Sequence, residues 1–366
     1  MKNRHAGWAA AGGMALLLLP WVVAQDSSGQ TDKESTATMS ATQQDSPPRK
    51  IVVGSLMHAM YSDYPGLEKR LQELSAFIDD MAREAQQKYG AGLDLVALPE
   101  HAVTSGRQGN AAEIAEPLQG PVLDILGAAA RKHKTYVIVP LHLAEDASKQ
   151  KVYNACVLLD RQGKVAGIYR KVYPVADDNN ILERGTLPGK DFPVFQCDFG
   201  KLGIQICFDM YYDAGWETLA RKGAEIVVWS TASPGILKAQ CRSQKHHYYL
   251  LTSTFRDNAT LVDPAGFIAA QTTTPSSVLV EQIDLSYVLL DWQVKLENGK
   301  ILTDKYGKAA GYRYSEAEDG GIFWSNDPKI PVMKMVRELG LELSSDCISR
   351  NRKLQDAARG GPPSLK

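Results

Sequence analysis

Residues 202–209 (LGIQICFD) are the stretch on which the interpretation of this chain depends. An apolar run typical of a β-strand ends at Cys207, and Phe208, Asp209 and a predicted helix follow it. Reactive groups of α/β sheets gather at the carboxyl ends of strands, and a helix N-terminus beside a thiol favours the thiolate. The alternative is a buried structural cysteine. Two further stretches bear on that choice.

Both stretches also end a strand on a charged residue. In residues 94–101 (DLVALPEH), Glu100 follows an apolar strand and Pro99. Apolar surroundings raise a carboxyl pKa toward the range useful for proton transfer, although alone Glu100 fits a solvated loop better. In residues 163–174 (GKVAGIYRKVYP), another strand ends at Arg170–Lys171, although alone Lys171 could equally be an ordinary surface lysine. Together a base, a cation and a thiol are the groups that nucleophilic acyl transfer requires.

The composition is that of an ordinary globular protein. The chain has 366 residues, of which 44% are hydrophobic and 23% charged, and 41 basic and 42 acidic residues give a net charge of −1. This balance supplies material for a large core. It gives no reason to expect nucleic acid or an anionic membrane as a partner.

The first residues have the pattern of a secretory signal. A basic start (residues 2–5) precedes the apolar run MALLLLPWVV, which is too short to span a bilayer comfortably, and Val22 and Ala24 suit a cut before Gln25. We therefore expect residues 1–24 to be a cleaved signal peptide and the protein to be secreted or periplasmic. An uncleaved anchor is the alternative.

The rest divides into three parts. Residues 25–49, rich in Ser, Thr and Gln, predict a disordered linker. Residues 50–285 alternate strand and helix patterns, and residues 286–366 form a C-terminal extension. Strands are expected near residues 51–56, 94–98, 135–141, 153–160, 164–170, 203–207, 226–229, 250–254, 259–263 and 278–284, and helices near 67–89, 118–133, 214–222 and 236–248. This pattern predicts a layered α/β domain with sheets inside and helices outside.

Five cysteines remain after the predicted cleavage: Cys156, Cys197, Cys207, Cys241 and Cys347. An odd number leaves at least one thiol unpaired within the chain. Their irregular spacing suits neither a disulfide framework nor a zinc site.

With these stretches in this order, the sequence resembles the nitrilase-like carbon–nitrogen hydrolases of the amidase or carbamoylase type. The resemblance covers roughly residues 50–285 and rests on LPEH, YRKVYP and GIQICFD, with GAEIVVW (223–229) at the family's distance after the cysteine. It implies a four-layer αββα sandwich and a catalytic triad of Glu100, Lys171 and Cys207. It also implies no metal, no organic cofactor, and a homodimer or larger homo-oligomer.

The chemistry that the resemblance implies uses each of these groups. Glu100 takes the thiol proton, and the thiolate of Cys207 attacks an amide-type carbon. Lys171 and a backbone N–H, for which Phe208 is the predicted donor, hold the oxyanion, and losing one such donor costs about 3 kcal/mol. Water then clears the thioester. Lys171 is also expected to lower the thiol pKa.

Further site residues follow from the same comparison. The family's second glutamate is best matched by Glu183, although its spacing to Gly189 is about one residue short. Relatives read Asp-x-Arg-Phe-Pro-Glu after the cysteine, so Tyr211 stands where an arginine would bind a substrate carboxylate, and Asp213 is expected to cap the next helix. His142 and Tyr173 either line the pocket or pack in the core.

Two other departures from the family concern residues beyond the pocket. Residues 242–246 (RSQKH) differ from the family's Arg-Ala-x-Glu-Asn, which leaves the dimer contact and the pocket floor open. His246 and His247 are adjacent on a predicted helix and point apart, so we expect no metal site there.

These features favour an exported hydrolase of a small-molecule amide or N-carbamoyl compound. Phe208–Asp209 after the cysteine is typical of amide and carbamoyl hydrolases, whereas nitrile-cleaving relatives carry Trp-Glu. An N-acyltransferase using the same thioester and a non-catalytic binding module are the alternatives. No nucleic acid partner and no stable membrane insertion are expected.

Overall fold

The computed structural model describes residues 45–60 and 64–364. The predicted signal peptide and residues 25–44 of the predicted linker lie outside the described residues. Within the described residues, no helix is long and apolar enough to cross a membrane.

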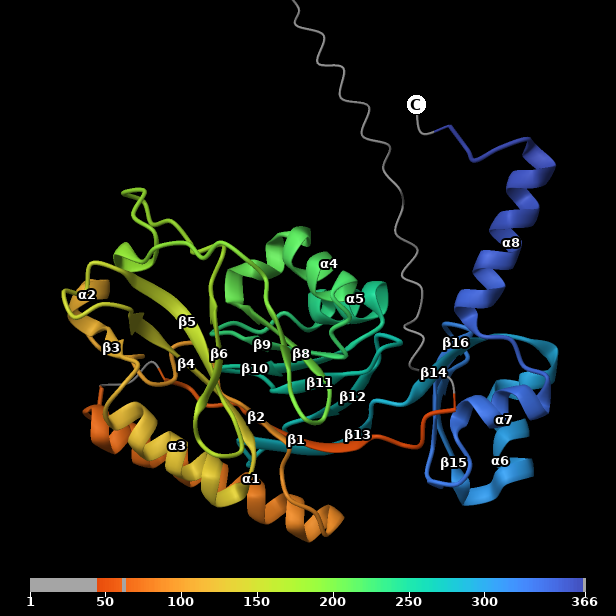
Figure 1. The fold of residues 1–366 in the computed structure, drawn as a ribbon, viewed down its shortest axis with the longest axis horizontal. Helices are drawn as coiled ribbons and strands as arrows, with labels where there is room; N and C mark the ends of the chain where they lie inside the picture. The colour runs from red at the N-terminus through yellow and green to blue at the C-terminus, as the bar shows by residue number, and fades with distance from the viewer. Residues whose placement is uncertain (1–44, 61–63, 365–366) are drawn as a thin grey trace, which may run out of the picture. The chain divides into compact units, whose positions relative to one another are not determined.

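Two sheets carry most of the strands of the described residues (Figure 1). In hydrogen-bonding order, the first contains β13 (Val278–Asp284), β1 (Lys50–Leu56), β2 (Leu95–Ala97), β4 (Tyr136–Ala144), β5 (Val152–Leu159) and β6 (Val165–Arg170), with β3 (Glu116–Pro117) paired to β4. The second contains β12 (Ile268–Gln271), β11 (Thr260–Val262), β10 (Tyr249–Ser253), β9 (Ile226–Ser230), β8 (Lys201–Ile206) and β7 (Val194–Gln196).

Helices cover the outer faces of these sheets. They are α1 (Leu67–Tyr89) and α3 (Pro121–His133) on the first sheet, and α4 (Asp213–Arg221) and α5 (Ile236–His246) on the second. A short helix, α2 (Ala111–Ile114), precedes β3. The layers are therefore helix, sheet, sheet and helix, which confirms the predicted αββα sandwich.

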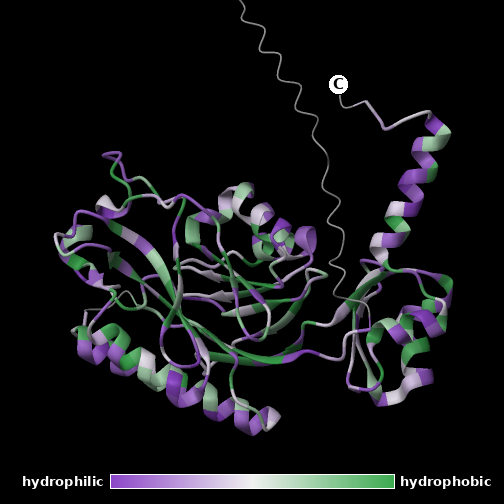
Figure 2. Ribbon diagram, viewed as in Figure 1, coloured by the Kyte–Doolittle hydropathy of each residue, from purple (hydrophilic) through white to green (hydrophobic). Residues whose placement is uncertain are grey.

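Strand alternation explains the layering. Ile51 and Val53 of β1 face the second sheet, and Ile204 and Ile206 of β8 meet them in one buried cluster. The alternate residues of β1 pack instead on Leu71, Leu74 and other buried residues of α1. Successive side chains point to opposite sides of the sheet. Central strands such as β4 and β9 are therefore buried on both faces, one against the other sheet and one against the helices. Figure 2 shows this as green strands between helices of mixed colour.

Strand direction brings the three strand ends to one edge. β1, β2 and β4 run parallel, and β5 runs antiparallel to both β4 and β6, so β2 and β6 point the same way. Glu100 follows β2, Lys171 follows β6, and Asn154 lies near the start of β5 at the same edge. β8 of the facing sheet ends immediately before Cys207.

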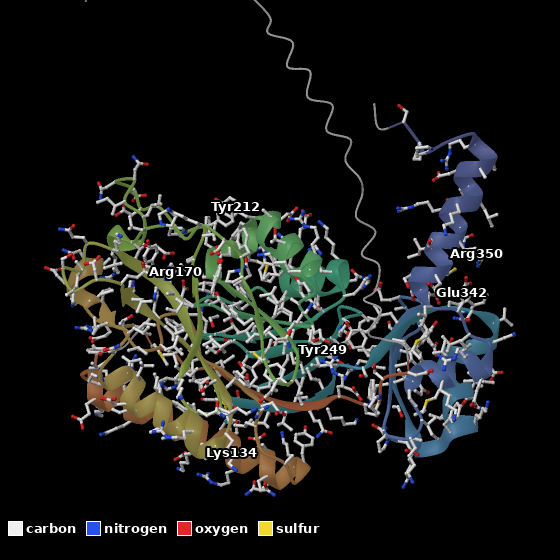
Figure 3. All side chains as sticks on the ribbon, in the orientation of Figure 1. Lys134, Arg170, Tyr212, Tyr249, Glu342 and Arg350 are labelled. Atoms are coloured by element: carbon white, nitrogen blue, oxygen red, sulfur yellow. The ribbon has the colours of Figure 1, made fainter. Side chains whose placement is uncertain are left out.

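Residues beyond 285 form further structure that the sequence did not predict in detail. β14 (Tyr287–Asp291), β16 (Gly320–Ser325) and β15 (Ala310–Ser315) form a small antiparallel sheet. α6 (Lys300–Tyr306) and α7 (Val332–Leu339) share a buried cluster with it. The last helix, α8 (Ser344–Arg359), has no buried residue, is mostly hydrophilic in Figure 2, and carries Arg350, which pairs with Glu342 at 2.8 Å (Figure 3).

The described residues also contain short 3₁₀ turns, which are η2 (Glu183–Gly185), η3 (Cys207–Tyr211), η4 (Val294–Gly299) and η5 (Gly307–Ala309).

Two local predictions are wrong. The segment after Cys207 is the 3₁₀ turn η3, so the thiol does not stand at the N-terminus of an α-helix. Asp213 is the first residue of α4 rather than its cap, and it forms an ion pair with Arg242. The capping position is Tyr212, whose extended backbone turns the chain into the helix.

Candidate active site

Lys171 is the centre of the polar cluster at this edge. Its side chain is only 1% exposed, and its ammonium donates to Glu100 Oε1 at 2.9 Å and to Glu183 Oε1. Burial alone lowers the pKa of a lysine, but the two carboxylates raise the pKa of Lys171 above its usual value. The cluster therefore contains one buried cation between two anions.

Glu183 reaches this cluster from an irregular loop. It lies in η2, where Glu183 and Arg184 have φ of 31° and 63°. The carboxylate also accepts from the Val175 N–H at 3.1 Å. The left-handed backbone lets the loop carry Glu183 to Lys171 although its spacing to Gly189 departs from the family pattern. That Glu183 acts as the family's second glutamate remains a prediction.

Asn154 joins the two carboxylates, and the sequence analysis missed it. Its amide donates to Glu100 Oε1 and to Glu183 Oε2, each at 2.9 Å. The backbone N–H of Ala232 donates to the second oxygen of Glu100 at 3.2 Å. The available signal was a lone asparagine inside the apolar strand VYNACVLL, where a buried polar side chain requires partners.

Cys207 sits on a left-handed turn at the end of β8. Its φ is 40°, an unfavourable value for a residue with a Cβ, and the Trp229 indole N–H donates to its carbonyl at 3.0 Å. Its thiol is hydrogen-bonded to the side chains of Glu100 and Thr231. The strained turn presents the sulfur to the base instead of burying it in the core, and all five cysteines are free thiols.

The protonation states differ from the sequence-based expectations. Burial, with the charge of Glu100, raises the pKa of Cys207 to about 12 and outweighs the opposing effect of Lys171. For Glu100, burial acts to raise the pKa, but the charge and hydrogen bond of Lys171 bring the pKa down to about 2. The expected lowering of the thiol pKa by Lys171 is therefore present but is outweighed by burial and by Glu100. The expectation of a raised Glu100 pKa was wrong. At neutral pH the resting site holds a thiol, a carboxylate and an ammonium.

Asp209 connects the cysteine turn to the segment that follows Lys171. This fully buried carboxylate accepts from the Ile206 N–H at 2.9 Å, from the Tyr169 hydroxyl at 2.7 Å and from the Tyr173 N–H at 3.0 Å. One side chain therefore fixes both segments.

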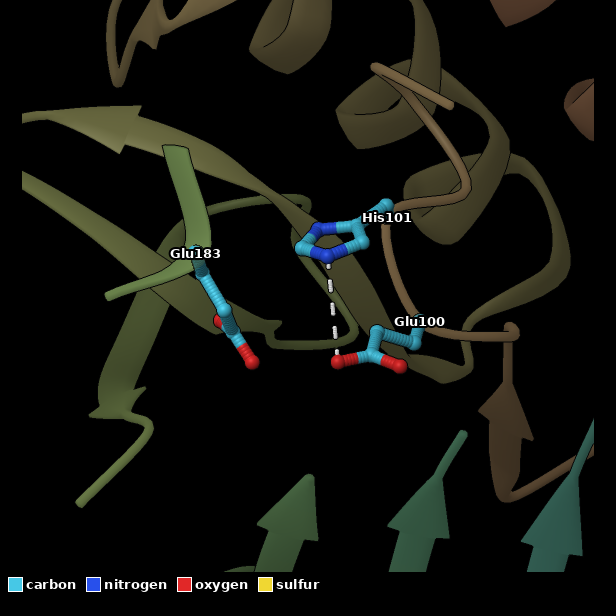
Figure 4. Close-up of side chains that lie close together, drawn as sticks. All are labelled: Glu100, His101 and Glu183. Carbon is cyan, nitrogen blue, oxygen red and sulfur yellow. Dashed lines mark ion pairs between the residues drawn. The ribbon is translucent and has the colours of Figure 1, made fainter. Parts of the chain in front are cut away.

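A histidine pair borders the cluster. His101, at φ 55°, stacks on the buried His142 with ring centres 4.1 Å apart, and its Nε2 lies 3.7 Å from Glu100 Oε1 (Figure 4). Burial lowers the pKa of both imidazoles, so both are neutral at neutral pH. Of the two predicted roles of His142, packing in the core fits the structure better than lining a pocket. Its ring is buried, and Nδ1 is hydrogen-bonded to the Thr104 hydroxyl at 2.8 Å.

Glu100, His101 and Glu183 also have the donor types of a metal site. Their ligand atoms lie within 4.8 Å of one another. However, the Lys171 ammonium donates to an oxygen of each carboxylate, so the lysine itself supplies the positive charge there. A bound ion would have to displace that ammonium from a buried position, which is costly.

The remaining predicted site residues lie on η3. Phe208 is partly buried and follows Cys207 directly, whereas Tyr211 is 62% exposed. The nearby Arg242 forms an ion pair with Asp213 and donates to the Met210 carbonyl at 3.0 Å.

The class of protein follows from this fold and site together. The structure is a four-layer αββα sandwich in which Glu100, Lys171 and Cys207 gather at the strand ends. The sequence model described as "Carbon-nitrogen hydrolase" matches residues 64–290 of this chain. The chain belongs to the carbon–nitrogen hydrolase family.

Named relatives are similar at modest identity. Omega-amidase NIT2-A from Xenopus laevis is 28% identical over 230 residues, which cover 57% of this chain and 82% of that protein. The deaminated glutathione amidase of Synechocystis is 29% identical over 173 residues, covering 44% of this chain and 60% of that protein. For "Probable nitrilase C965.09" from Schizosaccharomyces pombe, 28% identity covers 45% of this chain and 58% of that protein.

Solved structures show the same fold. The Saccharomyces cerevisiae Nit3 structure, from branch 10 of the nitrilase superfamily, has a TM-score of 0.53 and 21% identity, with 64% of this chain and 90% of that chain covered. A Nesterenkonia AN1 amidase of the same superfamily has a TM-score of 0.52 and 18% identity, covering 64% and 90%. At these identities the likeness concerns the fold alone.

Proposed function

We propose that this protein hydrolyses a non-peptide C–N bond of a small amide or N-carbamoyl compound through a thioester on Cys207. The observation that carries the proposal is the buried Lys171 ammonium, placed between Glu100 and Glu183 next to the thiol that is hydrogen-bonded to Glu100. A surface lysine or a structural cysteine does not need such partners. A buried ammonium does need them, because a buried charge is costly unless it is paired.

The protonation states of Cys207 and Glu100 at rest support concerted activation of the thiol. With Cys207 a thiol and Glu100 a carboxylate at rest, the proton moves from sulfur to Glu100 as the S–C bond forms. The oxyanion that develops is stabilised by the Lys171 ammonium and by a backbone N–H of η3, for which Phe208 is the proposed donor. Glu100 then returns the proton to the leaving nitrogen as the C–N bond breaks, which leaves the thioester.

Deacylation uses the same groups. Glu100 takes a proton from water as the hydroxide adds to the thioester carbon, and the acid departs as sulfur regains that proton. While Glu100 carries the transferred proton, Lys171 stays paired with Glu183, so the ammonium remains in place at the moment each oxyanion forms. Glu183 and Asn154 act in this scheme by holding Lys171 and Glu100 in position.

Amides are favoured over nitriles as substrates. Phe208–Asp209 follows the cysteine in place of the Trp-Glu of nitrile-cleaving relatives. The names of the similar omega-amidase and deaminated glutathione amidase point the same way. Because nitriles have no carbonyl oxygen before attack, donors arranged for an amide oxygen bind them less well.

The test compares the wild-type protein with Cys207→Ala on propanamide, with and without hydroxylamine. Ammonia release by the wild type alone, with hydroxamate formed when hydroxylamine is present, supports a hydrolase using a thioester. Efficient transfer to amines with little hydrolysis would identify an acyltransferase instead. Absence of turnover of every amide and ureido acid in a panel would leave a binding module and overturn the proposal.

We also propose that the protein is exported after removal of residues 1–24. The support is the basic start, the apolar run and the small residues Val22 and Ala24. Mass spectrometry of the protein from its native host should find a mature N-terminus near Gln25, and intact Met1 in the cytoplasmic fraction would contradict export.

A further inference from the structure

Four aromatic rings gather beside the cysteine turn. They belong to Tyr173, Phe208, Tyr211 and Tyr212, and we call this group the aromatic shelf. Tyr173 stacks on Tyr212 with ring centres 3.8 Å apart and planes 13° apart, and Phe208 lies 4.9 Å from Tyr211 and 5.9 Å from Tyr212. The rings therefore form one connected surface rather than scattered aromatic residues.

The shelf is fixed to the catalytic groups. Phe208 is bonded to Cys207 in the chain, and Tyr173 lies two residues after Lys171. Asp209 accepts from the Tyr173 N–H at 3.0 Å and from the N–H of Ile206 at 2.9 Å. These buried hydrogen bonds fix the backbone of Tyr173 relative to the turn that carries Cys207 and Phe208, so the base of the shelf has a defined position beside the thiol.

The outer rings are open to solvent. Tyr211 is 62% exposed and Tyr212 is 40% exposed, and Figure 3 shows Tyr212 at the surface near the start of α4. The Lys238 ammonium lies 4.9 Å from the centre of the Tyr211 ring, which is a cation–π contact that holds the ring in place. Connected exposed aromatic rings are typical of binding surfaces.

We propose that the aromatic shelf binds a planar aromatic substituent of the substrate, and that Tyr211 is the residue that sets this preference. The inference rests on the proposed amide hydrolysis and names its substrate class. The ring faces of the shelf can stack on another aromatic ring. Tyr211 also lacks the charged fork with which an arginine binds a carboxylate.

The experiment measures kcat/KM for three amides: propanamide, 3-phenylpropanamide and 3-cyclohexylpropanamide. The cyclohexyl compound matches the phenyl compound in size but has no flat face. We expect the wild type to favour the phenyl over the cyclohexyl compound about tenfold through KM, equivalent to about 1.4 kcal/mol. Tyr211→Ala should remove this preference, and Tyr211→Phe should keep it. Trp292→Ala, at a 60% exposed indole in the C-terminal segment, is the matched control and should keep it as well.

Other outcomes are decisive against the inference. Equal phenyl preference in the wild type and Tyr211→Ala would overturn it. So would a Tyr211→Ala variant that dissociates an oligomer in light scattering and loses activity equally on all three amides, because the shelf would then contact a second copy of the chain.

A failure of the proposed amide hydrolysis can be distinguished from a failure of this inference. If the wild type hydrolyses none of the amides, calorimetric binding of 3-phenylpropanamide to Cys207→Ala, with and without Tyr211→Ala, still decides the inference. Binding that weakens about tenfold on loss of the ring supports the shelf, and unchanged or absent binding overturns it.

Discussion

Replacing Asp209 by asparagine should separate activity from stability. The carboxylate accepts from Ile206 and Tyr169 through one oxygen and from Tyr173 through the other. An asparagine oxygen can take over only one of these two sides. If it keeps the pair of donors, its NH₂ faces the Tyr173 N–H, and the segment after Lys171 loses its hydrogen bond to the cysteine turn.

The two contributions to stability oppose each other. Burial raises the pKa of Asp209 from 3.8 to about 6. The native state therefore favours the protonated form of Asp209. The stability that this protonation contributes is complete below about pH 4 and lost above about pH 6, and the total loss between these pH values is about 3 kcal/mol. Asparagine carries no charge and avoids that loss, but it leaves one buried donor unpaired at about 1–3 kcal/mol. At neutral pH the free energy of unfolding should change by less than about 2 kcal/mol.

Activity should fall much further. Displacing catalytic groups by about 1 Å costs on the order of a hundredfold in rate, and we expect at least that loss in kcat/KM for Asp209→Asn. Urea unfolding at pH values from about 4 to 8 and amide hydrolysis measure the two quantities. Asp213→Asn is the matched control, since that carboxylate is 60% exposed and paired only on the surface.

Two results would refute this reasoning. One is a wild-type kcat/KM in Asp209→Asn. The other is a plot of unfolding free energy against pH that has the same slope in the variant as in the wild type between about pH 4 and 6. Ionisation of Asp209 should lower wild-type stability over this range, and the variant should lack that decline.

The remaining predictions concern other charged groups. Glu183→Gln should lower kcat at least tenfold, because Lys171 then loses one of its two anionic partners; a kcat equal to the wild type would remove Glu183 from the mechanism. Lys171→Met should destabilise the protein by about 3–5 kcal/mol at neutral pH and recover stability as the pH falls, since the buried Glu100 and the partly buried Glu183 then lack their cation and bind protons more tightly. Urea unfolding against pH tests this, and a pH-independent loss would contradict it. Arg313→Ala should cost about 1–3 kcal/mol because it leaves the fully buried Asp263 carboxylate without its guanidinium at 2.5 Å. Arg337→Ala, at a surface ion pair, is the control for that variant and should change stability by less than about 1 kcal/mol.

Much of the sandwich could be predicted from the sequence because its periodicities are strong. Apolar residues of α1 recur every three or four positions along one face, and those at Leu71, Leu74, Ile78, Met81 and Ala85 are buried. Glu100, Lys171 and Cys207 could be grouped because each follows an apolar strand. Such a pattern is local in the chain and therefore visible without coordinates.

What could not be predicted depends on contacts across the fold. The pKa of Glu100 is set by Lys171, 71 residues away, and by Asn154 on another strand. The 3₁₀ turn after Cys207 depends on Asp209 capturing donors from two segments. The C-terminal sheet pairs β14 with β16 across a long connection, and no short-range pattern reports such a pairing.

The central claim is that Cys207 forms a thioester with the acyl part of an amide. Its most direct test is rapid quenching of the wild-type protein with 3-phenylpropanamide, followed by intact-mass and peptide-mass analysis. The account predicts an adduct with the mass of the acyl group, located on the peptide that contains Cys207 and absent from Cys207→Ala. Turnover without any such adduct, together with continued hydrolysis by Cys207→Ala, would contradict it.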